Sequence, residues 1–117
     1  MRRAHAKQYE MAAHLLLADE PFSRNRHKDA FDDARFRGAL GLYRRLRALL
    51  ADLERAHARG GRIAVAREMR RGQPTVRLEL ALAEATRGSH TTWLDEGAWG
   101  VLLMHPLAQQ ILGARAA

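Results

Sequence analysis

Residues 32–59, DDARFRGALGLYRRLRALLADLERAHAR, are the most regularly patterned stretch of this 117-residue sequence. At about 100° of rotation per residue, its apolar side chains fall within roughly one third of a helix circumference. These core-facing residues are Ala39, Leu42, Leu46, Leu49, Leu50 and Leu53. Asp32 or Asp33 suits the start of a helix, where a carboxylate accepts unpaired amides, and Gly60 with Gly61 suits its end. The pattern predicts one long amphipathic helix from Asp32 to Arg59.

The other side of this predicted helix is rich in arginine. Arg37, Arg44 and Arg55 lie opposite the leucines, and Arg45, Arg47 and Arg59 flank them. Acidic residues three or four positions away usually neutralise arginines on a helix. Arg44, Arg45 and Arg47 have no acid at those offsets. Either they meet acids from other segments or lie solvated with their stems on apolar surface, or they contact phosphates or an acidic protein.

Before the long helix, residues 2–18 have the apolar spacing of a first helix, and Pro21 is expected to end it. The connection that follows, residues 23–28, has a second group of basic side chains: Arg24, Arg26 and Lys28. Such side chains position phosphate backbones. They equally suit a solvated loop, or a short helix capped by Ser23, whose arginines pair with nearby acids.

After Gly61 the apolar residues no longer recur at helical spacing and instead occupy every second position. Ile63, Val65 and Met69 alternate with polar or small residues, and so do the apolar residues from Val76 to Leu82. This predicts an antiparallel hairpin, with residues 70–74 as its loop of three to five residues. A third short strand is expected at residues 91–94.

The last segment contains helix signals. Asp95 is expected to cap a helix that continues to about Met104, with Leu94 and Trp99 packing together across its start. Pro106 suits the first position of a final short helix, which Gly113 should end.

Together these elements predict a single α+β domain spanning residues 1–117. It has two N-terminal helices, the second long, then a three-stranded antiparallel sheet and one or two short C-terminal helices, with the helices covering one sheet face. A winged-helix fold is a minority alternative, because Arg70 and Arg71 would form a basic wing. The helix before the hairpin is too long for a recognition helix, unless Gly38 and Gly41 break it.

Composition limits the classes of function. The chain has 20 basic and 13 acidic residues, a net charge of +7 and no cysteine, which excludes disulfides and thiolate sites. A pI near 11.2 favours an anionic partner, although biased codon usage would also explain why arginine replaces lysine. The longest apolar run is too short for a bilayer, so no membrane partner is expected. The basic start lacks the apolar stretch of a signal peptide, and a cytoplasmic location is expected.

Catalytic signatures are missing from the sequence. The six histidines are scattered and none belongs to a His-Glu-x-x-His motif, and phosphate-binding glycine loops and a Gly-x-Ser-x-Gly motif are absent. We therefore expect no enzyme, no metal site and no cofactor. Trp93 and Trp99 are expected in the core; if either is exposed beside arginines, base stacking or a protein contact becomes plausible.

The sequence thus favours a small, non-catalytic, basic module that binds nucleic acid or another polyanion. The predicted contacts are Arg24, Arg26, Lys28, Arg37, Arg44, Arg45 and Arg47. The alternative is a protein-interaction or homo-oligomerisation module, in which the long helix packs against an acidic partner or a second copy.

Overall fold

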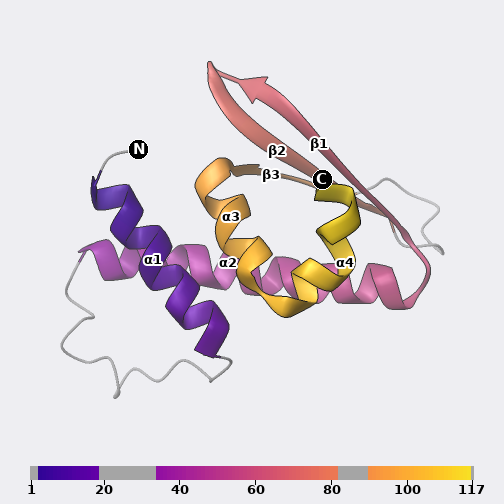
Figure 1. The fold of residues 1–117 in the computed structure, drawn as a ribbon, viewed down its shortest axis with the longest axis horizontal. Helices are drawn as coiled ribbons and strands as arrows, with labels where there is room; N and C mark the ends of the chain where they lie inside the picture. Colours follow the sequence, from indigo (N-terminus) through magenta and orange to yellow (C-terminus); the bar gives the residue numbers. More distant parts are fainter. Residues whose placement is uncertain (1–2, 19–33, 82–89, 117) are drawn as a thin grey trace.

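The computed structural model describes residues 3–18, 34–81 and 90–116. Helices and strands follow one another in the predicted order (Figure 1). They are α1 (Arg3–Ala18), α2 (Ala34–Ala58), β1 (Arg62–Arg70), β2 (Gln73–Ala81), β3 (His90–Asp95), α3 (Glu96–Met104) and α4 (Pro106–Ala116). The α+β class, the long second helix, the three-stranded antiparallel sheet and the two short C-terminal helices are confirmed.

The long helix α2 places its apolar face in the core, as predicted. The predicted residues Ala39, Leu46, Leu49, Leu50 and Leu53 are buried, and only Leu42 is no more than partly buried. The helix ends at the two glycines. Gly60 has φ +65°, its amide donates to the His57 carbonyl, and the Gly61 amide donates to the Ala56 carbonyl over 2.7 Å. This bonding pattern is a Schellman cap, which satisfies carbonyls that the last helical turn leaves unpaired.

The α2 helix is also continuous through Gly38 and Gly41, contrary to what a winged-helix fold requires. At Gly38 a Cβ atom would come within 2.7 Å of Nε2 at the flexible end of the Gln8 side chain, so Gly38 leaves room for this side chain of α1. The expected caps Asp32 and Asp33 and the segment 23–28 lie outside the described residues.

The strands form one antiparallel sheet in the order β1-β2-β3. On β2 the alternate residues Val76, Leu78 and Leu80 are buried, while Arg77 and Glu79 point to the opposite face. The helices therefore cover one face of the sheet, as predicted, and leave the other face open.

The loop predicted for the hairpin, residues 70–74, is longer than the turn in the structure. Strands β1 and β2 pair up to Arg70↔Gln73, which leaves Arg71 and Gly72 as a two-residue turn with φ of +53° and +76°. Positive φ at both positions is typical of the type I′ turn, whose twist matches that of the strands. Pro74 lies within β2 opposite Met69, one residue beyond the last residue paired with β3, so the ladder to β3 does not need its missing N–H.

The end of this hairpin extends away from the helices (Figure 1). Met69 is on the helix-facing side of β1, as its alternation predicts, yet it remains 66% exposed. Met69 stays exposed because none of the described helices lies over this end of the hairpin.

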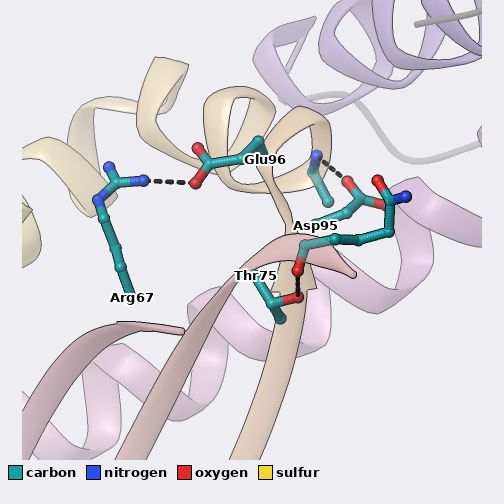
Figure 2. Close-up of polar contacts among 6 residues, drawn as sticks. Arg67, Thr75, Asp95 and Glu96 are labelled. Atoms are coloured by element: carbon teal, nitrogen blue, oxygen red, sulfur yellow. Dashed lines mark hydrogen bonds and ion pairs between the residues drawn. The ribbon is translucent and has the colours of Figure 1, made fainter. Parts of the chain in front are cut away.

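The C-terminal helices begin where the sequence predicts. Asp95 Oδ1 accepts a hydrogen bond from the Ala98 amide over 2.7 Å and caps α3 (Figure 2). Pro106 begins α4, where a missing amide proton costs nothing. The predicted end at Gly113 was wrong, because α4 continues to Ala116. Glycine lowers helix stability by only about 1 kcal/mol and does not by itself terminate a helix.

One core joins all these elements, with buried side chains from every helix and strand. Leu94 and Trp99 are both buried in it, as their expected packing across the start of α3 requires. Among the described residues, no helix combines the length and apolar character needed to cross a membrane.

Candidate functional site

The exposed side of α2 carries the predicted arginines that the structure describes. Arg37, Arg44, Arg45 and Arg47 are all exposed. The other three predicted contacts, Arg24, Arg26 and Lys28, lie outside the described residues. Within α2 there are six arginines and only two acidic residues, Asp52 and Glu54. The helix therefore presents a clear excess of positive charge.

Arg45 joins this helix to the edge of the sheet. Its guanidinium nitrogen Nη2 donates to the backbone carbonyl of Trp93 over 2.5 Å. That carbonyl belongs to β3, the edge strand, where backbone groups lack a neighbouring strand. A carbonyl is neutral, so the contact positions the Arg45 guanidinium without cancelling its charge.

Arg44, Arg45 and Arg47 have no acid at helical spacing, which suggested that their charge is free. The structure qualifies this expectation. Arg45 bonds Trp93, and Arg44 and Arg47 each interact with another group. Tertiary partners are invisible to a comparison of positions along one helix. Arg55, by contrast, has an acid three positions away and pairs with it, Asp52.

Arg45 and Arg47 flank opposite sides of α2. Whereas Arg45 reaches β3, Arg47 lies at a shallow hollow of about 290 Å³ beside the turn between α3 and α4. This hollow is lined by Arg47, Leu50, Ala51, Glu54, His105 and Leu107. His105 Nδ1 accepts a hydrogen bond from the Leu107 amide and so caps α4. The arginines are therefore spread around the exposed side and do not converge on one pocket.

A second polar group lies on the open face of the sheet and was not predicted as a site. Trp93 is 38% exposed there, and its indole Nε1 donates to Glu68 Oε1 over 2.7 Å. The Arg70 guanidinium carbon lies 4.1 Å from the centroid of the ring, a cation–π contact. Arg77 lies 3.4 Å from the second oxygen of Glu68. We call Trp93, Arg70, Glu68 and Arg77 the open-face cluster.

The sequence contained a signal for the exposure of Trp93. Leu94 precedes the helix cap Asp95 and must be buried to pack with Trp99. Because neighbouring side chains on a strand point to opposite faces, Trp93 must then lie on the uncovered face. The pairing Val76↔Leu94 and Arg77↔Trp93 shows this directly.

One exposed ion pair attaches the hairpin to α3. Arg67 Nη1 on β1 lies 2.5 Å from Glu96 Oε1 on α3 (Figure 2). Thr75 donates its hydroxyl to the Gln73 carbonyl in the same region. The Thr75 bond stays within β2, so only the Arg67–Glu96 pair restricts how the hairpin lies relative to α3, and an exposed ion pair adds little stability by itself.

The described residues offer little for catalysis. They contain no group of three or more histidine, aspartate or glutamate side chains arranged to hold a metal ion. Among the groups that the structure describes, the one with a shifted pKa is Tyr9: partial burial, its hydrogen bond to Asp95 and the negative charge of Asp95 raise its pKa to about 12. A tyrosine that holds its proton more tightly is suited to a structural hydrogen bond, not to proton transfer near neutral pH.

The sequence matches no protein-family model, and searches of curated proteins and of solved structures found no match either. The arrangement that stands out is chemical: an arginine-rich helix that contacts, through Arg45, the strand that displays an exposed tryptophan.

Proposed function

We propose that this chain is a non-catalytic module that binds nucleic acid, or a polyanion of similar charge density, through the exposed arginine side of α2. Arg37, Arg44, Arg45 and Arg47 would contact phosphates, and Arg24, Arg26 and Lys28 add positive charge in the preceding segment. The expected cytoplasmic location would give such a module access to DNA and RNA.

The observation that carries this proposal is the exposure of the α2 arginines together with the small number of acidic residues within α2 itself. Arg37, Arg44, Arg45, Arg47 and Arg55 are exposed along a helix with two acidic residues. The bond from Arg45 to the Trp93 carbonyl is compatible with the proposal, because a guanidinium has five N–H donors and can contact a phosphate while it bonds a carbonyl.

Phosphate binding explains why arginine would be useful on this surface. The planar guanidinium bonds two phosphate oxygens at once, and binding releases the counterions condensed on the nucleic acid. The affinity should consequently fall as salt rises, with a slope set by the number of phosphates contacted. An acidic protein lacks a condensed counterion layer of that density, so its binding would depend on salt less steeply.

The test is a titration of the protein against duplex DNA, single-stranded DNA and RNA at several salt concentrations. We expect micromolar or tighter affinity at low salt and a linear fall of log affinity with log salt. If none of these polyanions binds at low salt, the proposal is wrong.

Two variants that each add one negative charge test whether the arginine side of α2 is the binding surface. Ala48→Glu places a carboxylate among the arginines of α2, one helical turn from Arg44, whereas Gln110→Glu makes the same type of change on the exposed side of α4. We expect the first to lower affinity by about 5-fold, equivalent to about 1 kcal/mol, and the second to have a smaller effect. Equal losses would mean that binding responds only to net charge.

The alternative, a protein-interaction or homo-oligomerisation module, was motivated by the leucine face of α2. In the structure Leu46, Leu49, Leu50 and Leu53 are buried within the single chain. A partner would therefore bind the arginine side of α2 and not its leucines. Light scattering over a range of concentrations distinguishes the two, because a strict monomer that binds nucleic acid supports the first proposal.

A further inference from the structure

The open face of the sheet combines an exposed aromatic ring with arginine. Its side chains alternate with the buried ones, and the strand pairing places Ala66, Arg77 and Trp93 in one row across the three strands. Small side chains and threonines occupy much of the remaining face. A flat ligand that approaches the indole of Trp93 would therefore meet mainly the side chains of the open-face cluster, above all Arg70.

The indole of Trp93 is held in place but only lightly covered. Its bond to Glu68, which lies on β1, means that the side chain spans from β3 over the central strand β2. The group that the structure places over its ring is the Arg70 guanidinium at 4.1 Å, and Arg70 is itself exposed. The ring is thus pre-positioned, while its cover is a flexible charged side chain that can move away.

The charges around the ring favour an anionic ligand. Glu68 and Glu79 both lie near Arg77, at 3.4 and 3.9 Å, so these two acids share one basic partner. Arg70 and Arg71 add positive charge at the end of the hairpin. Arg45 bonds the carbonyl of Trp93 itself, which brings the basic side of α2 to the same strand.

The turn at this end of the hairpin provides a separate observation. Arg71 has φ +53°, a left-handed conformation that non-glycine residues adopt at a cost and that asparagine, aspartate or glycine usually fills in such turns. Strain of this kind persists when the surrounding structure enforces it, and it often marks a functional position. An exposed arginine at this strained position fits a role in binding anions.

We propose that Trp93 stacks against an unpaired base of a single-stranded nucleic acid, while Arg70 turns from the ring to a neighbouring phosphate. Stacking a base on an aromatic ring is generally stronger than an exposed cation–π contact, so the exchange is favourable. This inference rests on the proposed function and narrows its ligand to nucleic acid with accessible bases. Duplex DNA, whose bases are paired and stacked, could bind only through the arginines.

A single-tryptophan protein makes the test specific. Trp99 is 2% exposed and its Nε1 has no hydrogen-bond partner among the described residues, so Trp99→Phe removes no bond seen there. In this background the tryptophan fluorescence, excited at a wavelength that the two tyrosines do not absorb, comes from Trp93 alone. We expect a single-stranded oligothymidylate to quench it, whereas heparin should bind with comparable salt dependence and leave it nearly unchanged.

Substitution of Trp93 gives a second readout. Trp93→Leu should weaken oligothymidylate binding by about 5- to 150-fold, the range measured for base–aromatic stacking, and should leave heparin binding unchanged. Met69→Ala is the matched control, because Met69 is also an exposed apolar residue of the hairpin but lies on the opposite sheet face. It should bind oligothymidylate like the original protein. Circular dichroism confirms that each variant is folded.

The outcomes separate this inference from the proposed function. If heparin and oligothymidylate both bind but neither quenching nor an effect of Trp93→Leu is seen, the stacking site is wrong and the polyanion proposal stands. If no polyanion binds, both are wrong. If polyglutamate quenches Trp93 as strongly as oligothymidylate, the surface recognises acidic protein and the inference is overturned.

Discussion

The Tyr9 hydroxyl donates a hydrogen bond to Asp95 Oδ2 over 3.0 Å, joining two residues that are 86 positions apart in the sequence. The other carboxylate oxygen of Asp95 accepts the Ala98 amide and caps α3. One side chain therefore both begins α3 and attaches α1 to the end of β3. The Tyr9 ring also packs against Gly97, so this corner is held by contact as well as by hydrogen bonds.

Replacing Tyr9 with phenylalanine should lower the free energy of unfolding by about 1 kcal/mol, because it removes one hydrogen bond and keeps the ring. Asp95→Ala should cost more, since it removes this bond and the helix cap. Urea unfolding of the two single variants and the double variant tests the link. In the Asp95→Ala background, Tyr9→Phe should cost little; a full additive cost would show that the hydroxyl does not act through Asp95.

The same bond predicts a dependence on pH. The pKa of Tyr9 is raised to about 12 in the folded protein, against about 10 for an unperturbed tyrosine in the unfolded chain. Above pH 10 the unfolded state loses this proton first, so the folded state becomes less stable as pH rises from about 10 to 12. Below pH 10 the contribution is fully present. Unfolding measured at pH 9 and pH 11 should show a smaller loss in Tyr9→Phe than in the original protein, and equal losses would contradict the assignment.

Gly97 is the position where a single methyl group should be most disruptive in α3. A Cβ there would lie 2.5 Å from the Tyr9 ring, a rigid group that cannot move aside cheaply. We expect Gly97→Ala to destabilise the protein by about 1–3 kcal/mol. Gly100 is the matched control on the same helix, because no atom lies within 4 Å of its added Cβ. Gly100→Ala should stabilise by up to about 1 kcal/mol, and equal effects in thermal unfolding would rule out the clash.

Local patterns in the sequence were sufficient to predict the order and type of the helices and strands. The leucine spacing of α2 predicts its buried face, and the glycines that follow it predict its cap, because both depend on residues within a few turns. The starts of α3 and α4 could be predicted for the same reason, because Asp95 and Pro106 act on the helical turn that follows them directly. These signals are short-range, so no knowledge of the tertiary arrangement is required.

The candidate site was less predictable because it depends on contacts between distant segments. The bond from Arg45 to Trp93 spans 48 positions, and no helical spacing rule can reveal it. The exposure of Met69 depends on how far the hairpin extends past the helices, which the apolar alternation does not specify. Trp93 was expected in the core because tryptophan is usually buried there; its face follows only once Leu94 is recognised as the buried neighbour.

The turn at Arg71 predicts a stabilising substitution. Arg71→Asn should raise stability by about 0.5–1 kcal/mol, because asparagine tolerates the left-handed conformation that Arg71 adopts at φ +53°. Gly72→Ala should destabilise, since Gly72 has φ +76° and alanine disfavours it. Thermal unfolding compares the two. If arginine at this position serves anion binding, Arg71→Asn should also weaken oligothymidylate binding while it stabilises the fold.

Arg45 is expected to act in both stability and binding, which distinguishes it from Arg37 on the same helix. Arg45→Met removes the bond to the Trp93 carbonyl and should lower the free energy of unfolding by about 1 kcal/mol. A buried bond from a charged donor would contribute more, but Arg45 is exposed. Arg37→Met removes an equal charge from an exposed position near the start of α2 and should change stability by less than about 0.5 kcal/mol. Both variants should lower the salt slope of single-stranded DNA binding by about 0.7, the loss of one phosphate contact. A slope unchanged in both would remove these arginines from the interface. A loss of affinity in Arg45→Met with an unchanged salt slope would show that this residue acts by holding β3 and Trp93 in place and not by contacting phosphate.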